Sequence, residues 1–554
     1  MAESYGAFAL VLHSHLPYVL THDRLEEEWL FEAVVESYIP LLYALSQLVS
    51  QGISPKITVG VTPVLLEQLA DVRFVPRLSD YLDQKIRVAK EDQAFFREKR
   101  ESDRARLATL WEELYRRTAL FFHENLSSDL IGAFRQLQKK GHLELIASAA
   151  THAYLPLLGL DTSVRAQIVL GALCYQRHFH ARPRGFWLPE CAYRPASYWT
   201  PPIDGIAGLK PAARAGVDQI LASADLRYFF VDARQLAASP PRNQQHSPCR
   251  LYSLTGKAEG HSSPMTIFSR DFEATAQVWQ HDGGYPGDPL YLEFHKKQEK
   301  SGLRYWRITD RRASLTDKQP YMPELAFAQV STHAAQFAQV VRERLSNHWR
   351  RTGERGIVVA AFDTELFGHW WFEGPQWVSE VLRQLASVPE VTTTMCSEYL
   401  DAHPPQYTTQ LQESSWGEGG DHRVWWQSAT QPLWQDQYRA ECDMRELSER
   451  VDNLQLDNQV KRMMRQCGRE LLLLQSSDWP FMISTRNTPD HAQQRAALHY
   501  KNFQHCRRMV ERCLENETIA EEEWRRLAAM EQQDAVFPDL DPRVFREKSE
   551  SLLV

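Results

Sequence analysis

Short apolar runs that each end in polar residues recur along this chain, and they restrict the folds open to it. The clearest run is Gly356 to Phe362, which Asp363 follows at once. Other runs are Ala7 to Leu12, Lys56 to Val61, and those that begin at His142, Gly185, Tyr228 and Met265. Apolar runs separated by helical stretches are typical of buried parallel strands in βα units. The pattern therefore predicts an α/β barrel.

The strand-like runs lie in two blocks, residues 1–74 and 138–405, which we predict to form one catalytic barrel. Residues 75–137 are rich in Glu, Arg and Lys and carry apolar residues at helical spacing, which predicts a helical insertion. The pattern becomes almost wholly helical from about Leu411, so residues 406–554 are predicted to form a helical C-terminal domain. The Pro-, Ser- and Gln-rich stretch 239–248 is too long for a simple connection and is interpreted as a lid.

Charge and composition exclude several kinds of partner. The net charge of -8 and the isoelectric point near 6.2 argue against a nucleic-acid partner, which normally requires a basic face. No apolar run of 18 residues predicts a membrane span. The eight cysteines form no CxxC pair, and the N-terminus lacks a basic leader segment, which together predict a cytoplasmic protein with reduced thiols. The sequence leaves the oligomeric state open.

Two carboxylates are the strongest candidates for chemistry. Asp363 ends one predicted strand and Glu190 follows another, and the C-terminal ends of barrel strands face the active-site mouth. Cleavage of a glycosidic bond needs a pair of carboxylic acids. Arg194 could hold Glu190 ionised, although a structural salt bridge explains the same residues. Glu365 is an alternative acid beside Asp363.

The histidines permit a second interpretation. His13 and His15 form an H-x-H that places both side chains on one face of a strand. With Asp363 and His369 they could hold zinc, which would make the chain a metal-dependent hydrolase or deacetylase acting on carbohydrate. The same two histidines could instead donate hydrogen bonds to substrate hydroxyls.

Aromatic residues favour a sugar ligand. The chain has 16 tryptophans, and Trp416 lies in a Gly-rich loop where core packing explains a large ring less easily. Such a ring can stack on a sugar. Trp29, after three glutamates, has either a core or a sugar-binding role. Asp478, in a polar turn between helical stretches, is either a helix cap or a sugar contact.

With these residues in view, the sequence resembles glycoside hydrolase family 57, and more closely its 1,4-α-glucan branching enzyme group. The resemblance covers most of the chain. Five short segments together carry it: His13 to Pro17, Ala149 to Pro156, Trp187 to Tyr193, Asp363 to Pro375, and Trp416 to Trp426.

This resemblance implies an incomplete (β/α)7 barrel whose helical C-terminal domain closes over the cleft. It implies a retaining double displacement with Glu190 as nucleophile and Asp363 as general acid and base, and with the two carboxyl groups about 5 to 5.5 Å apart. It places His13, His15 and His152 at the cleavage subsite. Further glucan contacts are expected from Trp29, Arg270, Trp279, Gly287, Trp416, Asp478 and Asn487. The expected partner is an α-glucan such as amylose or glycogen, with no metal or other cofactor.

Two departures from the family pattern keep other functions open. The branching group carries a tyrosine in a lid loop that corresponds to residues 235–252, where this chain has Asn243 to His246 at the middle and Tyr252 only at the end. Asn487 stands where the family usually has glutamine. The alternatives are a mainly hydrolytic, amylase-like enzyme and a glucan-binding protein without catalysis.

Overall fold

The computed structural model describes residues 4–20, 23–239, 246–255, 264–280, 283–451 and 458–547. The middle of the predicted lid, residues 240–245, lies outside the described residues.

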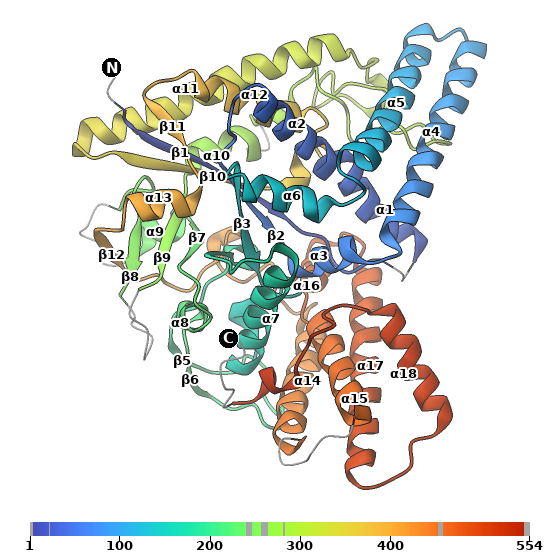
Figure 1. Cartoon of the computed structure of the whole chain (residues 1–554), viewed down its shortest axis with the longest axis vertical. Coiled ribbons are helices and arrows are strands. Elements are labelled where there is room, and N and C mark those ends of the chain that lie inside the picture. Colours follow the sequence, from blue (N-terminus) through green and yellow to red (C-terminus); the bar gives the residue numbers. More distant parts are fainter. Residues whose placement is uncertain are drawn as a thin grey trace.

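A ring of seven parallel strands forms the centre of the molecule (Figure 1). In order around the ring they are β1 (Gly6–Ser14), β2 (Ile57–Val61), β3 (Leu143–Ser148), β4 (Gly185–Trp187), β7 (Tyr228–Asp232), β9 (Thr266–Arg270) and β10 (Gly356–Asp363). β10 pairs with β1 over eight residue pairs, whereas it meets β9 only where Val359 lies opposite Arg270. The predicted (β/α)7 barrel is thereby confirmed, with its weakest closure between β9 and β10.

The remaining described strands are three residues long and lie outside this ring. They are β5 (Ser197–Trp199), β6 (Ala212–Arg214), β8 (Tyr252–Leu254), β11 (Val391–Thr393) and β12 (Tyr407–Thr409). β5 and β6 form an antiparallel hairpin, and β8 and β12 extend the sheet beyond β9.

Side chains of complementary size fill the barrel interior. Ala9 and Ala361 come from the neighbouring strands β1 and β10, and the large rings of Trp187, Phe230 and Phe268 come from β4, β7 and β9. All five are fully buried in one cluster. Since an interior of this kind is packed rather than hollow, the chemistry is confined to the strand ends.

Helices surround the strands and extend on both sides of them (Figure 1). Those up to β10 are α1 (Arg24–Ala33), α2 (Ile39–Ser50), α3 (Pro63–Ala70), α4 (Phe74–Glu98), α5 (Ser102–Leu120), α6 (Leu130–Lys139), α7 (Asp161–Phe179), α8 (Val217–Ser223), α9 (Ala233–Ala238), α10 (Phe272–Trp279) and α11 (Pro323–Thr352). Those after β10 are α12 (Gly374–Ala386), α13 (Cys396–Ala402), α14 (Gln431–Val451), α15 (Asn458–Leu474), α16 (Asp478–Thr485), α17 (Pro489–Leu514) and α18 (Glu521–Gln533).

Shorter turns complete the described elements. Two are π turns, η1 (Val34–Tyr38) and η2 (Phe121–Asn125). The 3-10 turns are η3 (Leu155–Leu157), η4 (Pro189–Cys191), η5 (Tyr285–Gly287), η6 (Leu315–Asp317), η7 (Thr364–Leu366), η8 (Glu418–Gly420) and η9 (Pro542–Phe545).

Two helical regions lie apart from the ring. α4 and α5 form an antiparallel pair that projects from one side, within the predicted insertion (Figure 1). α14, α15, α17 and α18 form the C-terminal group at the bottom of the same view. The prediction of helices from about Leu411 was too early, because they begin only at Gln431, after the loop that carries Trp416. That loop reaches back to the barrel, as described below.

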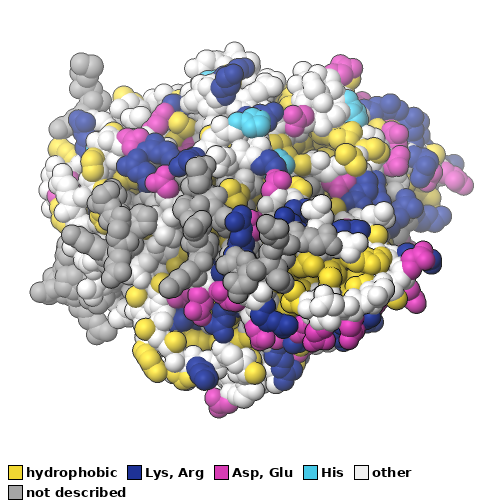
Figure 2. All heavy atoms as spheres, turned by 60° about the horizontal axis from the view of Figure 1, so that its bottom comes forward, with side chains coloured by type: hydrophobic (Ala, Val, Ile, Leu, Met, Phe, Trp, Pro, Cys, Tyr) yellow, Lys and Arg dark blue, Asp and Glu magenta, His cyan; other side chains and the backbone are white. Residues whose placement is uncertain are grey.

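One helical segment, Arg24–Ser50, is long and apolar enough to span a membrane by composition, with a mean hydropathy of 1.2 over its most apolar window. In the fold 61% of that window is buried against the rest of the protein, as in a core helix. On the face drawn in Figure 2, Lys and Arg side chains lie among Asp and Glu side chains with hydrophobic groups between them. A mixed surface of this kind agrees with the modest net charge.

Candidate active site

The two candidate acids lie at the C-terminal ends of barrel strands. Asp363 is the last residue of β10, directly opposite His13 on β1. Glu190 lies in turn η4, just after β4, and its φ of 62° and that of Cys191, 46°, are both left-handed. Non-glycine residues rarely adopt this conformation, and it is over-represented at functional sites. The turn directs the Glu190 carboxylate into the barrel mouth.

Glu190 is held by donors that come from distant parts of the chain. The indole Nε1 of Trp416 donates to one carboxylate oxygen at 2.7 Å, and the hydroxyl of Ser477 donates to the other at 3.4 Å. The backbone N–H of Trp416 also donates to the Glu190 carbonyl at 3.0 Å. The suggestion that Arg194 pairs with Glu190 was wrong. Arg194 is fully buried and lies 3.6 Å from Asp161 instead.

Three histidine rings stack beside the acids. His15 and His152 have ring centroids 3.9 Å apart, and the Nε2 atoms of His13 and His152 are 3.0 Å apart. Burial lowers the pKa of His13 and of His152 well below 6.5, so both rings are neutral at pH 7. His15 Nε2 lies 2.9 Å from the carboxylate of Asp478. Bonds within the protein thus hold the three rings in place beside the acids.

Burial raises the pKa of three acids at the mouth, Glu190, Asp363 and Glu365. It raises the pKa of Glu190 to about 8, with the neighbouring charge of Asp363 adding to the effect and the Trp416 hydrogen bond opposing it. It raises the pKa of Asp363 to about 6, against the opposing charges of His15 and Arg270. Glu365, which accepts from the Tyr38 hydroxyl and the His15 N–H, has a pKa of about 8. A proton is therefore available at the mouth near neutral pH.

Aromatic and cationic groups form one wall of the site. The ring of Trp416 lies 5.3 Å from Trp187 and 6.4 Å from Trp279, centroid to centroid. The guanidinium of Arg270 lies 5.4 Å from the Trp416 ring and pairs with Asp232. Trp279 is 44% exposed and faces outward. Flat rings combined with fixed polar groups suit the apolar faces and hydroxyls of a sugar.

Comparison with known proteins settles the family of this chain. The profile described as glycosyl hydrolase family 57 matches residues 9–412. The chain belongs to glycosyl hydrolase family 57. A second profile, described as the C-terminal part of 1,4-alpha-glucan branching enzymes, matches residues 436–545.

Family 57 relatives cover nearly the whole chain. A curated 1,4-alpha-glucan branching enzyme of Thermococcus kodakarensis is 38% identical over 546 residues, which are 96% of this chain and 77% of that protein. A probable 1,4-alpha-glucan branching enzyme of Mycobacterium tuberculosis is 32% identical over 511 residues, covering 89% of this chain and 90% of the relative.

Solved structures agree with this family and with its barrel. The family 57-type branching enzyme of Pyrococcus horikoshii has a TM-score of 0.89 at 37% identity and covers 99% of this chain and 98% of its own. The α-amylase AmyC of Thermotoga maritima has a TM-score of 0.82 at 28% identity, with 98% and 99% covered. The same fold therefore occurs in a protein described as a branching enzyme and in one described as an α-amylase.

Three of the predicted glucan-binding residues lie away from the acid pair. Trp29 on α1 has its ring against His491 of α17, with centroids 5.2 Å apart. Gly287 ends turn η5, where its carbonyl accepts from Arg311 at 2.8 Å. Asn487 is exposed just after α16. No ligand contact tests the roles of these or the other predicted binding residues, so those roles stay predictions.

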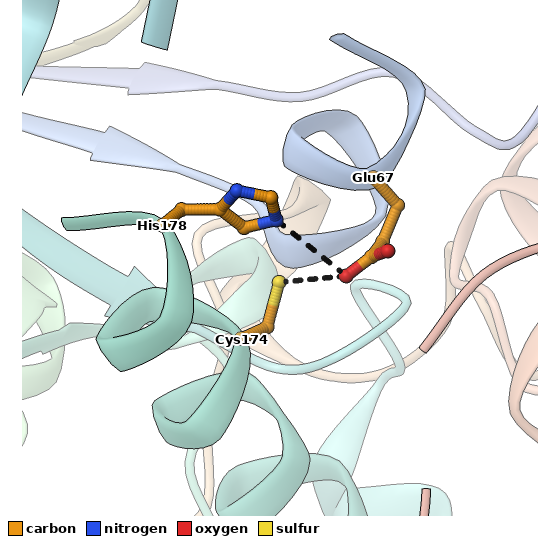
Figure 3. Close-up of side chains that lie close together, drawn as sticks. All are labelled: Glu67, Cys174 and His178. Atoms are coloured by element: carbon orange, nitrogen blue, oxygen red, sulfur yellow. Dashed lines mark hydrogen bonds and ion pairs between the residues drawn. The ribbon is translucent and has the colours of Figure 1, made fainter. Parts of the chain in front are cut away.

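The arrangement suggested for zinc does not form among the described residues. His369 Nδ1 lies 2.8 Å from Glu36 instead. Another cluster, Glu67, Cys174 and His178, brings potential metal ligands together between α3 and α7 (Figure 3). There the guanidinium of Arg177 already pairs with Glu67, and burial raises the pKa of the Cys174 thiol. An arginine on the carboxylate and a neutral thiol fit a structural ion pair better than a cation site.

Sequence reasoning missed two groups that fix the acids. Ser477 was seen only as part of a turn, and Tyr38, which donates to Glu365, lies in an apolar helical stretch that gave no signal. Asp232, the partner of Arg270, could have been suspected because it ends a predicted strand.

Proposed function

We propose that this chain is a 1,4-α-glucan branching enzyme, which cuts an α-1,4 bond and transfers the released chain to form an α-1,6 branch. One observation carries the proposal. The segment that matches the branching-enzyme C-terminal profile supplies Ser477 and Asp478, which contact Glu190 and His15 at the barrel mouth. The domain typical of branching enzymes is thus part of the reaction centre.

In the first step Glu190 acts as the nucleophile. Its carboxylate attacks the anomeric carbon while Asp363 gives its proton to the glycosidic oxygen, so that the C1–O bond breaks and a Glu190–C1 bond forms. The cleaved chain leaves with a new hydroxyl at its non-reducing end. The transferred chain stays bound to the enzyme as an ester of Glu190.

This step requires an ionised Glu190 and a protonated Asp363, the reverse of the order of their pKa values, which are about 8 for Glu190 and about 6 for Asp363. The two acids interact, so they titrate as a pair that holds one proton over a window near neutral pH. Trp416 and Ser477 both donate to Glu190, and hydrogen bonds to a carboxylate favour its charged form. These bonds already oppose the raised pKa of Glu190, and we assign the charge to Glu190 and the proton to Asp363 in the reactive form because nucleophilic attack requires it.

In the second step Asp363 acts as a base. It takes the proton from the 6-hydroxyl of an acceptor glucan, whose oxygen attacks the anomeric carbon and releases Glu190. Two inversions retain the α configuration. Transfer in place of hydrolysis requires that the acceptor reach the ester before water does, which the largely buried acids and the histidine stack favour.

A mainly hydrolytic enzyme is the second candidate. The Thermotoga maritima α-amylase shares the fold over nearly its whole length, and residues 235–252 lack the central tyrosine expected of the branching group. The lower identity to the amylase, 28% against 38% for the curated branching enzyme, favours branching.

All eight cysteines are free, seven of them buried, which supports our placement of the protein in the cytoplasm.

The test is to incubate the protein with amylose and follow α-1,6 linkages by proton NMR together with new reducing ends. Branching predicts α-1,6 signal well above reducing-end release, and neither product from Glu190→Gln or Asp363→Asn. Reducing ends without α-1,6 signal would replace the proposal with hydrolysis. Neither product from the unaltered protein would leave only the binding-protein alternative.

A further inference from the structure

Trp370 is the most unusual exposed side chain on the segment that carries Asp363. Its neighbour Trp371 is fully buried, whereas the Trp370 ring is 52% exposed. The ring lies beside that of Phe294, with centroids 4.4 Å apart and planes tilted by 32°. Large exposed rings of this kind mark binding surfaces more often than isolated small apolar groups do. We refer to Trp370 and Phe294 together as the aromatic shelf.

A network of charged groups anchors both residues of the aromatic shelf. Arg304 donates to Glu36 at 2.8 Å and to the His369 carbonyl at 3.1 Å, and its guanidinium lies 5.6 Å from the Phe294 ring. His369 Nδ1 lies 2.8 Å from Glu36. Since the residue before Trp370 and the ring of Phe294 are both anchored, the two rings are presented in a set orientation without a ligand.

Polar groups border the Phe294 side of the shelf. A narrow crevice beside Phe294 is lined by Glu32, Lys85, Lys297 and the anchoring residues Glu36, Arg304 and His369. Lys297 Nζ lies 5.9 Å from the Phe294 ring centroid and is exposed. Rings that stack on sugar faces, together with charged groups that bond to hydroxyls at their edge, form a recurrent kind of carbohydrate site.

The shelf is continuous with the reaction centre. The backbone N–H of Trp370 donates to the Glu365 carbonyl at 3.2 Å, and the Glu365 carboxylate accepts from the His15 N–H at 3.0 Å. Trp370 therefore lies on the same anchored segment as Asp363 and Glu365, and a polymer longer than the mouth is required to reach it. Short substrates that fill only the mouth would not reach it.

We propose that the aromatic shelf binds an α-1,4-glucan chain outside the reaction centre and so holds polymeric substrate at the barrel mouth. This inference rests on the proposed action on α-glucans and adds a second binding site to it. Loss of one stacking ring should weaken binding of long glucans about three- to tenfold. The chemistry at Glu190 and Asp363 should be unaffected.

The experiment compares Trp370→Ala, Trp370→Phe and Phe294→Ala with the parent. Amylose affinity is measured by gel retardation in a Glu190→Gln background, where no turnover occurs. The rate of fluoride release from α-maltosyl fluoride is measured in the active background. Tyr198→Ala, in strand β5, removes another ring that is 73% exposed and serves as the matched control.

The shelf predicts weaker amylose retardation for Trp370→Ala and Phe294→Ala, recovery in Trp370→Phe, no change in Tyr198→Ala, and unaltered fluoride release. Parental retardation in both alanine variants would overturn it. A parallel loss of fluoride release would also overturn the proposal. In that case Trp370 and Phe294 would hold the catalytic acids in place and would not bind a glucan chain outside the reaction centre. Failure of the parent to form α-1,6 bonds would refute the branching proposal alone, since the binding measurement does not depend on transfer.

Discussion

At the scale of single residues, the sequence located the acids but not what controls them. Glu190 and Asp363 were predicted because each follows an apolar run, and the structure places both at strand ends. Arg194, the expected partner of Glu190, is adjacent in sequence but lies against Asp161. The actual donors, Trp416 and Ser477, are 226 and 287 residues away from Glu190 in the chain. Contacts over such separations depend on the assembled fold, which local patterns do not describe.

The paired acids predict a bell-shaped pH dependence of kcat/KM. The reactive form holds one proton on the pair, so activity should rise as pH increases through about 6 and fall as pH increases through about 8. Initial rates on a soluble glucan between pH 4 and pH 10 would measure both limbs. A rate that stays constant from pH 5 to pH 9 would contradict the pairing.

Trp416→Phe tests the hydrogen bond to Glu190 while keeping an aromatic ring. The lost indole N–H favoured the ionised carboxylate, so its removal should raise the pKa of Glu190 and move the alkaline limb of the pH profile, which lies near pH 8, upward. A bond to a charged group contributes about 1.5 to 3 kcal/mol, which corresponds to a fall in kcat of about 10- to 100-fold.

Trp279→Phe is the matched control, because that ring lies beside Trp416 and is half exposed. It should leave the alkaline limb in place. An equal shift of the limb in both variants would show that the rings, and not the indole N–H of Trp416, set the titration.

At the scale of elements, the strands of the ring were predictable and the short strands outside it were not. β1 and β10 are strands of nine and eight residues that contain the apolar runs Ala7 to Leu12 and Gly356 to Phe362, and both were expected. The three-residue strands β5, β6, β8, β11 and β12 carry no periodic signal and exist through their neighbours. The helices after β12 begin at Gln431 and not near Leu411, because the stretch between these two residues forms the loop that carries Trp416.

Helix α16 contributes its first residue, Asp478, to the barrel mouth, and this predicts a pH-dependent stability. His15 lowers the pKa of Asp478 to about 2, below the ordinary value of 3.8. A depressed carboxyl pKa stabilises the fold at pH values above the unfolded pKa, and this contribution disappears as pH falls toward 2. Asp478→Asn should therefore lower the free energy of unfolding by about 2 kcal/mol at pH 7.

Denaturant unfolding of the parent and of Asp478→Asn, from pH 7 to pH 3, checks this. The difference between the two should be nearly constant down to pH 4 and should shrink below it. A difference that is absent at pH 7 would mean that the pair of Asp478 and His15 does not join α16 to the barrel.

At the scale of the whole molecule, the order of strands along the sequence predicted a barrel. It did not predict how the barrel closes. β9 and β10 meet at the single pair of Val359 and Arg270, which no sequence pattern marks. The C-terminal domain also returns to the barrel through Ser477 and Asp478, so the site exists only in the complete fold. Similarity to a protein of known structure reveals this contact between the C-terminal domain and the barrel. The residues of one chain, taken alone, do not reveal it.

The buried carboxyl group of Glu190 should make the parent protein less stable than the inactive variant Glu190→Gln. A carboxyl group whose pKa is raised by folding binds its proton more tightly in the native state, so its contribution to stability is lost as pH rises through the folded pKa. For Glu190 this window runs from about 4.5 to about 8. Glu190→Gln keeps the shape without the charge and should raise Tm by about 1 to 3 °C at pH 8.

Calorimetry of the parent and of Glu190→Gln at pH 5 and pH 8 would measure this. The advantage of the variant should be larger at pH 8 than at pH 5. Equal or lower Tm values for the variant at both pH values would contradict a raised pKa for Glu190.

The central claim is that Glu190 forms the covalent bond to the transferred glucan, and mass spectrometry of a trapped intermediate tests it most directly. Asp363→Asn would be incubated with α-maltosyl fluoride, whose leaving group needs no acid, so the ester should form and then persist without a base to release it. The account predicts one maltosyl group on the peptide that contains Glu190, and none when Glu190→Gln is added. A maltosyl group on another carboxylate, such as Glu365, would contradict it.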